Sequence, residues 1–544
     1  MHFFISEASW SKPSLFLDHW GKPLFTLLSS PFSQLGYSGI IGFNILVFVF
    51  TVLVGWRILR NFNCHWSWSV AFPFLLLASN QYNITVLNGL TEPLFSLFLV
   101  SGMLFLQEKK WLLTALVIGC LPFLRSEGQL PFVLILAVLL VRKEFKYIAL
   151  LFVPFIIYAL VGEVSLGDPF WYFTRSPYHL ANNIYGSGSY FHYLINWRQY
   201  FGWSSLVLLA LGITSFLILL KLRKTYLLRW DIIVLAAGSF LGIIALHSYF
   251  WGSGKNGSLG LLRIATQGLP GFLLFLIYLI EQVRVNKQLL SSWWKIIPAS
   301  LIILAIINLS YPTTPLIDED LMQATQFVQK NKQGHQRLFF YHPLIGFSLK
   351  SNPLLKDKTH YQLGSKSLQK LPYGFFKYGD FLLWDSHFGK VEEVNPLLYL
   401  FDHPNFTAVN SMVESESAVW VFQYVPSSYK KAHPFENRTT LANNFKADIS
   451  NDEYHNLPSI KTKNQSNTYQ LKMTTDQPCR IVVTVDNSDY RAFEMIQGEN
   501  EVSFTLPPNK NYSLYIWNYD RVKLSVSGEL NLVEKVYAEV WTNR

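Results

Sequence analysis

Apolar segments long enough, or nearly long enough, to cross a bilayer recur throughout the first 312 residues. A transmembrane helix needs about 20 mostly apolar residues, so the pattern predicts a polytopic α-helical membrane domain. The two shortest segments flank LRSEGQ and predict a hairpin of short helices. The ten expected spans are 38–57, 67–84, 90–106, 111–124, 128–141, 147–164, 203–220, 230–248, 259–280 and 293–311.

Charge is divided unevenly between the two parts of the chain. Residues 1–312 contain 10 acidic and 21 basic residues, whereas residues 313–544 contain 25 and 24, so the net charge of +10 belongs to the apolar part. A nucleic-acid-binding protein gathers its basic residues on a folded polar face. Here 14 of the 21 fall in alternate loops, which by the positive-inside rule face the cytoplasm. We therefore expect no nucleic-acid partner, and both chain ends on the outer side of the membrane.

Residues 1–37 precede the first expected span and form the first outer loop. The opening MHFFISEASW is too polar and too short for a signal peptide. Two explanations stay open. Either the first span carries the short tail across the membrane, or the true start lies upstream and a preceding helix is missing.

The character of the chain changes from YPTTPLIDED onward, where polar and apolar residues mix periodically as in a soluble domain. IDEDLMQATQFVQKNK predicts a capped amphipathic helix, and HQRLFFYHP and YGDFLLWDSHFG predict strands followed by loops. Alternation from about residue 467 predicts a terminal β-sandwich. The expected domains are the first outer loop (1–37), the membrane domain (38–312), an extracytoplasmic α/β domain (313–466) and a β-rich domain (467–544).

The soluble part and the cysteines offer few chemical motifs. The three cysteines lie far apart and predict neither a disulfide framework nor a zinc site. The stretch GDFLLWDSHFGKVEE is compatible with either a structural turn or a catalytic or metal-binding role. It gathers four candidate ligands: Asp380, Asp385, His387 and Glu392.

Ionisable groups beside apolar helices are costly, so each is a hypothesis of function. In LFLDHWGKPLF, Asp18 suits a general base toward an acceptor hydroxyl, Lys22 suits a phosphate oxygen, and His19 can assist. Pro23 predicts an extended backbone at Lys22. The alternative is an ordinary membrane entry with Trp20 as an aromatic anchor rather than a substrate contact.

Two further outer segments carry charge at the mouths of spans. In NGLTEPLF, Glu92 is expected to pair with Arg125 or Arg263, or to cap its own helix, or to act in catalysis. In LRSEGQ, Arg125 and Glu127 are expected either to pair with each other or to bind a ligand. The residue types alone leave these alternatives open.

Two long outer loops complete the set of candidates. GDPFWYFTRSPYHLANNIYGSGSYFHY contains Arg175 and Tyr178 among aromatic residues, which stack on sugars and also anchor at lipid headgroups. WGSGKNGSLGLLR is a glycine-rich loop before a helix, and Lys255 with Arg263 suits a phosphate group. This loop is not a Walker sequence, so nucleotide binding is not implied.

Together these motifs resemble a known family. DHWGKPLFTLLSSPF, NGLTEPLF, LPFLRSEG, the aromatic loop ending in YGSGSYFHY, and WGSGKNGSLGLLR, in this order, resemble the bacterial multi-pass glycosyltransferases of the GT-C fold. The branch that they look like contains the protein O-mannosyltransferases and the lipid A aminoarabinose transferase. The resemblance covers roughly residues 10–312.

The resemblance implies a transferase of the bacterial inner membrane with a periplasmic C-terminal domain. Such enzymes move a sugar from a polyprenyl-phosphate carrier to a lipid, glycan or protein of the envelope, often with a divalent metal such as Mg or Mn. It implies Asp18 as the acid of the first loop, Lys22 near the acceptor and phosphate, and Arg263 as a phosphate ligand, while Arg125, His19 and Lys255 are further candidates. The expected departure from the family is that no N-terminal membrane helix precedes Asp18, which stands only four positions before Lys22.

Two other functions compete with the transferase. A transporter or flippase predicts ionisable residues at mid-membrane and paired half-helices in an internal repeat, and the sequence contains neither. A non-catalytic scaffold, whose outer domain binds glycan, remains compatible with the missing N-terminal helix. The sequence therefore favours a polyprenyl-phosphate-sugar-dependent glycosyltransferase.

Overall fold

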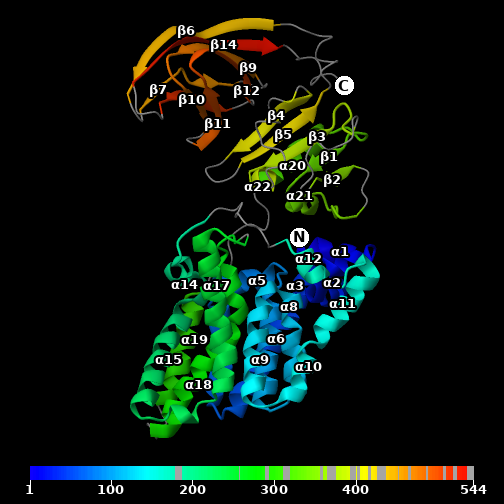
Figure 1. The fold of residues 1–544 in the computed structure, drawn as a ribbon, viewed down its shortest axis with the longest axis vertical. Helices are drawn as coiled ribbons and strands as arrows, with labels where there is room; N and C mark the ends of the chain where they lie inside the picture. The colour runs from blue at the N-terminus through cyan, green and yellow to red at the C-terminus, as the bar shows by residue number, and fades with distance from the viewer. Residues whose placement is uncertain are drawn as a thin grey trace. The chain divides into compact units, whose positions relative to one another are not determined.

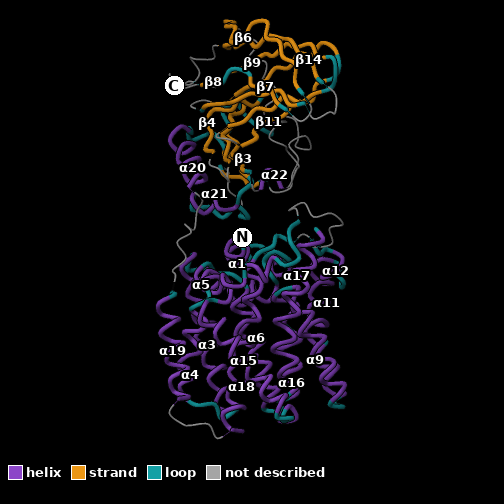
Figure 2. The backbone as a smooth tube through the Cα atoms, turned by 90° about the vertical axis from the view of Figure 1, so that its left-hand side faces the viewer, coloured by secondary structure: helices purple, strands orange, loops and turns teal. Residues whose placement is uncertain are grey.

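The structure is a computed structural model, and it divides the chain into two compact units, Met1–Leu316 and Ile317–Arg544 (Figure 1). Helices fill the first unit, and strands dominate the second (Figure 2). The residues described are 1–177, 187–256, 258–287, 293–309, 319–355, 359–363, 375–386, 388–391, 400, 403, 405–413, 418–425, 436–450, 453–462, 467–485, 488–506, 510–518 and 523–535.

Within the described residues, five helical segments are long and apolar enough to cross a membrane, and a sixth counts if a pair bent by 78° is one span. Four further apolar helices have 10–17 residues. Every expected span coincides with one of these segments, which confirms the polytopic helical fold. The long segments are Tyr37–Asn61, Phe145–Leu166, Trp203–Lys221, Trp230–Ser253 and Leu262–Val285, the bent pair is Trp66–Leu77 with Asn80–Leu87, and the short ones are Glu92–Gln107, Trp111–Leu124, Ser126–Val141 and Lys295–Ile307.

Short helical turns interrupt several of these segments (Figure 1). The larger helices are α1 (His2–Ala8), α2 (Pro23–Ser33), α3 (Tyr37–Asn61), α4 (Trp66–Leu77), α5 (Asn80–Leu87), α6 (Glu92–Gln107), α7 (Trp111–Gly119), α9 (Gln129–Val141), α11 (Val153–Leu166), α15 (Trp203–Lys221), α17 (Ser239–Ser253), α18 (Leu269–Lys287) and α19 (Trp293–Ile307). The shorter ones are η1 (Pro13–Leu17), α8 (Leu121–Leu124), η2 (Ser126–Gly128), η3 (Phe145–Tyr147), α10 (Ile148–Leu151), α12 (Trp171–Thr174), α13 (His192–Ile195), α14 (Trp197–Phe201), η4 (Thr225–Leu227), α16 (Trp230–Ile233), η5 (Val234–Gly238) and η6 (Leu262–Gly268).

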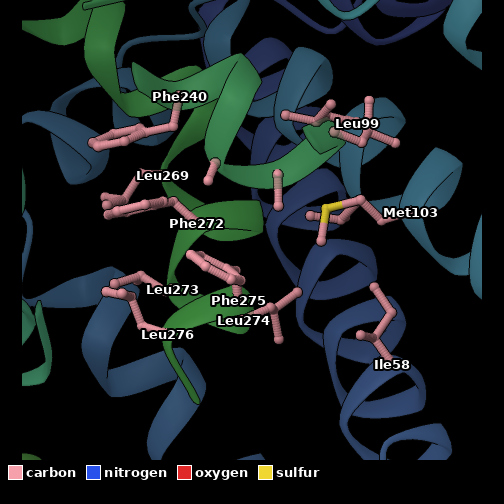
Figure 3. Close-up of a cluster of buried hydrophobic side chains, with 14 of the residues drawn as sticks. Ile58, Leu99, Met103, Phe240, Leu269, Phe272, Leu273, Leu274, Phe275 and Leu276 are labelled. Carbon is pink, nitrogen blue, oxygen red and sulfur yellow. The ribbon is translucent and has the colours of Figure 1, made fainter. Parts of the chain in front are cut away.

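One helix forms the centre of the bundle. Within the segment Leu262–Val285, which contains η6 and most of α18, the most apolar stretch of 18 residues is buried along its whole length. The corresponding stretches of α3 and α15 are one third buried. Figure 3 shows α18 side chains among Leu99 and Met103 of α6 and Phe240 of α17. The rings of Phe240 and Phe272 stack with centroids 4.4 Å apart. A helix that is apolar all round is either buried or exposed to lipid, and this bundle contains both kinds.

The second unit begins with an α/β layer. Its sheet has the order β2-β1-β3-β5-β4, with β1 parallel to β2 and β3, and β5 antiparallel to β3 and β4. Leu338 and Phe340 pack with α20 on one face, while Phe339 packs on the opposite face, as the period of a strand requires. The elements are α20 (Glu319–Asn331), β1 (Leu338–Phe340), α21 (Pro343–Ser348), β2 (His360–Gln362), β3 (Phe381–Asp385), α22 (Phe388–Val391), β4 (Phe406–Val413) and β5 (Ala418–Tyr424).

The C-terminal part is built from two further sheets, β11-β10-β13-β7 with β8 beside β13, and β12-β9-β14-β6. Their inner faces share one apolar core, which includes Ile481 and Leu514 from one sheet and Leu471 and Leu530 from the other. Three of the strands precede residue 467, where the sequence pattern placed the start of this region. The strands are β6 (Glu436–Ile449), β7 (Tyr454–Asn456), β8 (Ile460–Lys461), β9 (Asn467–Thr475), β10 (Cys479–Val485), β11 (Ser488–Met495), β12 (Gly498–Leu506), β13 (Asn511–Trp517) and β14 (Leu524–Lys535).

Two glycines give a matched test of helix packing in the bundle. A Cβ atom at Gly119 would lie 2.4 Å from the carbonyl oxygen of Leu151, whereas a Cβ at Gly42 would meet nothing within 4 Å. We expect Gly119→Ala to destabilise the protein by about 1–3 kcal/mol through overpacking. Gly42→Ala removes a glycine from a helix interior and should leave stability unchanged or raise it.

The measurement is the thermal unfolding midpoint of both variants and the wild type in one detergent. A Gly119→Ala protein as stable as Gly42→Ala would contradict the close approach of α7 and α10.

Candidate functional site

A buried carboxylate, Glu92, lies at the centre of a charged cluster. It is the first residue of α6, and its side chain is 1% exposed. Its Oε1 lies 2.8 Å from Arg125 Nη1 and 3.6 Å from Arg263 Nε. Of the three alternatives for Glu92, the structure thus shows pairing with both arginines. We call the end of the bundle that carries this cluster the site end.

The hairpin between α8 and α9 supplies the second carboxylate. Glu127 Oε1 lies 3.0 Å from Arg125 Nη2 and 3.2 Å from His247 Nε2 of α17. The hairpin brings the backbone of Gly128 close to that of Leu121, since a Cβ at Gly128 would lie 2.2 Å from the Leu121 backbone. Arg125 therefore bridges two carboxylates from different elements. The expected pairing with Glu127 is present, and Arg125 pairs with Glu92 as well.

Arg125 also binds the residue that stands at the N-cap position of α6. Its Nη1 donates to Thr91 Oγ1 at 3.0 Å, and the Thr91 side chain makes no capping hydrogen bond to its own helix. Glu92 still stands in the first turn of α6, where a negative charge is favourable. The NGLTEPLF motif thus joins α6 to the hairpin.

Lys22 adds a further buried cation at the site end. It is 9% exposed, precedes α2, and lies in the electrostatic field of Arg125, Glu127, Glu92 and Asp18. Burial, and then the Arg125 guanidinium, lower the pKa of Lys22 to about 8. Its ammonium group is therefore charged at neutral pH but loses its proton more readily than an ordinary lysine.

The backbone at Lys22 differs from the expectation of an extended conformation. Its ψ of 106° avoids the helical region, as the following proline requires, but its φ of +64° is left-handed. A non-glycine residue in a sparsely populated conformation costs about 1–3 kcal/mol. The turn is held because Asp18 Oδ1 accepts from Gly21 N at 2.8 Å and Asp18 O accepts from Lys22 N at 3.1 Å.

The first loop also contacts the aromatic loop through His19. The His19 ring packs against Trp171 and Tyr172 of α12, with ring centroids 5.1 and 5.6 Å apart. Tyr172 in turn donates to Pro122 O at 3.0 Å, next to the hairpin that carries Arg125. Burial lowers the pKa of His19, so its ring favours the neutral form at pH 7. We therefore retain His19 as a contact between loops at the site end.

The remaining sequence-predicted residues lie away from the charged cluster or outside the described residues. Trp20 is exposed, as is Lys255 after α17. Arg175 is half exposed, and its Nε lies 3.6 Å from Asp168 Oδ2. Among the described contacts, none joins these side chains to Glu92 or Glu127. Tyr178 lies outside the described residues.

Sequence reasoning missed His247, whose Nε2 contacts Glu127. It stands within the expected span 230–248, and an ionisable side chain inside a span marks a candidate site by itself. Two candidates of the second unit make local contacts: Asp380 pairs with Arg337, and Asp385 Oδ1 accepts from Phe388 N at 2.6 Å. His387 and Glu392, the other candidates there, lie outside the described residues.

A divalent metal finds no ready set of ligands in the part of the chain that the structure describes. No three His, Cys, Asp or Glu side chains gather there as a metal site would require. The carboxylates of Glu92 and Glu127 are paired with Arg125, so their negative charge is already neutralised and does not attract a metal cation. These residues therefore do not fit a bound Mg or Mn ion.

Comparison by sequence finds no matching protein family and no matching curated relative. By structure, the chain is similar to ArnT from Cupriavidus metallidurans in the apo state, with a TM-score of 0.52 and 11% identity over 79% of this chain and 93% of that one. It is also similar to the same protein bound to undecaprenyl phosphate, with a TM-score of 0.50 and 10% identity over 77% and 92% of the two chains. At this identity the likeness shows the fold, and the chain has the GT-C fold.

The arginine bridge predicts a strong effect on stability. Arg125→Gln leaves Glu92 facing Arg263 alone and Glu127 facing His247 alone, and breaking a buried ion pair costs about 3–5 kcal/mol. We expect a large drop in the thermal unfolding midpoint and partial recovery in the double variant Glu92→Gln/Arg125→Gln. The control is Arg175→Gln, whose half-exposed ion pair should matter little. A double variant less stable than Arg125→Gln would contradict the bridge.

Proposed function

We propose that this GT-C-fold protein is a membrane glycosyltransferase that takes a sugar from a polyprenyl-phosphate-linked donor. The observation that carries the proposal is the grouping of Lys22, Arg125 and Arg263 beside Asp18 at one end of the bundle. A protein of similar fold, ArnT, has been determined bound to undecaprenyl phosphate. The likeness in fold to a protein that binds a polyprenyl phosphate supports such a phosphate as the ligand of these cations.

The three cations suit the phosphate of the donor. Guanidinium groups bind phosphate oxygens in a fixed geometry, and an ammonium group adds a compact charge on a flexible stem. Arg263 Nε is buried and makes no hydrogen bond, although it lies near Glu92. An anionic ligand would satisfy this donor.

Asp18 is the base in this proposal, and Glu92 positions the arginines. Asp18 is half-buried in the first loop, where a substrate can reach it, and one of its oxygens accepts from Gly21 N. Glu92 is closed off from solvent and paired with Arg125 and Arg263, so an acceptor hydroxyl has no access to it. Of the two catalytic candidates from the sequence, Asp18 therefore fits proton transfer better.

The reaction then proceeds as one displacement at the anomeric carbon of the sugar. Asp18 takes the proton of the acceptor hydroxyl as its oxygen forms a bond to that carbon. The bond from the carbon to the phosphate oxygen breaks, and its electron pair leaves with the polyprenyl phosphate. Lys22, Arg125 and Arg263 stabilise the negative charge that develops on the phosphate.

We place the site end on the outer face of a bacterial inner membrane, and the acceptor is a lipid, glycan or protein of the envelope. The placement is supported by the basic residues in alternate loops at the opposite end of the helices, which the positive-inside rule assigns to the cytoplasm. The second unit follows α19 and on this placement lies on the outer side, as a periplasmic domain. A donor delivered there meets its acceptor without crossing the membrane.

Sugar transfer by membranes that contain the protein tests this proposal directly. With radiolabelled polyprenyl-phosphate sugars and envelope acceptors, we expect Asp18→Asn to lower the transfer rate at least about a hundredfold, as loss of a general base does. The asparagine keeps the hydrogen bond from Gly21 N, so the loop should keep its shape. The matched control is Glu163→Gln, which neutralises an exposed carboxylate near the end of α11.

Each alternative has its own result in this assay. Equal rates for Asp18→Asn and wild type would remove Asp18 as the base and direct attention to Glu92, the other catalytic candidate from the sequence. A wild-type protein that binds glycan but transfers nothing from any donor would make it a scaffold.

The lowered pKa of Lys22 predicts a pH dependence of donor binding. The ammonium form exists below a pH of about 8 in the empty site, so the affinity for undecaprenyl phosphate should fall as the pH rises through and above that value. Loss of a charge-assisted hydrogen bond corresponds to about a tenfold weaker Kd. The measurement is Kd between pH 7 and 9.5, with Lys22→Arg as the control because arginine stays charged. The same pH slope in both proteins would contradict a role for Lys22.

A further inference from the structure

A second polar site lies at the opposite end of the bundle from Glu92. A cavity of about 610 Å³ opens between the C-terminal ends of α3, α6 and α18 and the start of α16. Since α6 has 16 residues, this cavity lies roughly 22 Å from Glu92 along the helix. We call the end of the bundle that carries this cavity the basic end. The residues that line the cavity include Arg57, Gln107, Glu108, Arg229, Tyr278 and Gln282.

The cavity has a surplus of positive charge. Glu108 lies 3.3 Å from Arg57 and 2.6 Å from Lys110, and Asp231 lies 3.0 Å from both Arg142 and Arg229. Two carboxylates are thus shared among four cations. An anionic group would complete the charge balance of this end of the bundle.

The two arginines of the cavity wall have different roles. Arg229 donates to both oxygens of Asp231 and to the carbonyl oxygens of Leu106 and Gln107, so it is committed to holding the end of α6. Arg57 is 53% exposed and contacts Glu108 through one long hydrogen bond. Because Lys110 and Asn61 also bind Glu108, Arg57 can turn to a ligand without leaving that carboxylate unpaired.

A buried acceptor beside these cations narrows the chemistry of the ligand. Gln107 Oε1 is buried without a hydrogen-bond partner, while Gln107 Nε2 donates to Ile58 O at 3.2 Å. An unsatisfied buried acceptor costs about 1–3 kcal/mol. A ligand that fits this cavity therefore carries a negative group for Arg57 and an N–H or O–H donor for Gln107.

The cavity lies at the level expected for lipid headgroups. Trp56, Trp66 and Trp230 are exposed at the same helix ends, and Arg60 and Arg142 lie over the Trp56 and Trp230 rings. Exposed tryptophans with arginine beside them mark the interface between membrane and water. Phospholipids with ethanolamine or glycerol headgroups combine a phosphate with a hydrogen-bond donor at this depth.

We propose that the cavity at the basic end binds a phosphate ester that carries an N–H or O–H donor, with Arg57 on the phosphate and Gln107 on the donor. A phospholipid headgroup and a soluble phosphate ester share this chemistry. The site is separate from the proposed transferase site and does not depend on it.

The test uses the full-length protein, freed of lipid in detergent, and native mass spectrometry. Phosphatidylethanolamine and phosphatidylglycerol carry donors, whereas phosphatidylcholine has the phosphate but no donor. We expect the first two to be retained about tenfold better than phosphatidylcholine by the wild type. Arg57→Gln should lower retention of both about tenfold. The matched control Lys221→Gln, at an exposed cation that ends α15 and does not line the cavity, should not.

Soluble glycerophosphoethanolamine, added as a competitor, separates the two sources. Competition at micromolar concentration assigns the site to a soluble ester, and competition only at far higher concentration assigns it to a lipid; both support the proposal. Equal retention of all three lipids by the wild type would overturn it. So would equal losses in Arg57→Gln and Lys221→Gln, with thermal unfolding confirming that both variants are folded.

Discussion

The bridge that Arg125 makes between Glu92 and Glu127 is the interaction on which the site end depends. A carboxylate inside an apolar bundle is unstable unless a cation compensates it, and Glu92 is almost closed off from solvent. Arg125 comes from the hairpin after α8, Arg263 from η6 and His247 from α17, so the compensation of two carboxylates joins four parts of the chain. The arginines consequently stand in fixed positions before any ligand arrives.

The basic end compensates its buried acids in the same way. Asp231 is held by Arg142 and Arg229, and Glu281 by Arg284 and by the indole N–H of Trp68 at 2.7 Å. Ion pairs by themselves therefore do not identify the site. What distinguishes the site end is a buried lysine in a left-handed backbone conformation beside a half-buried Asp18, because strain and burial of this kind persist only where the surrounding structure enforces them.

Much of the fold and part of the site follow from the sequence. The ten expected spans reappear as helical segments, and α20, β1 and β3 lie within the stretches predicted for them. The pairing of Glu92 was also foreseen, as one of three alternatives. The early strands of the sandwich were not foreseen, because β6 is polar along its length and gains its partner only from β14 near the end of the chain. His247 was overlooked although it is an ionisable side chain within an expected span, and only its contact with Glu127 in the structure shows that it belongs to the cluster.

The sequence by itself determined that the first part of this chain is a multi-pass membrane domain and that ionisable groups gather at the ends of its spans. Hydropathy is a property of about 20 consecutive residues, so no distant contact is needed to read it. Only the tertiary structure decided that Arg125 serves two carboxylates, that His247 joins them, that Lys22 is buried near them with a positive φ, and that a polar cavity opens at the other end. These features depend on which helices are neighbours in the bundle. Packing between residues far apart in the chain determines those neighbours.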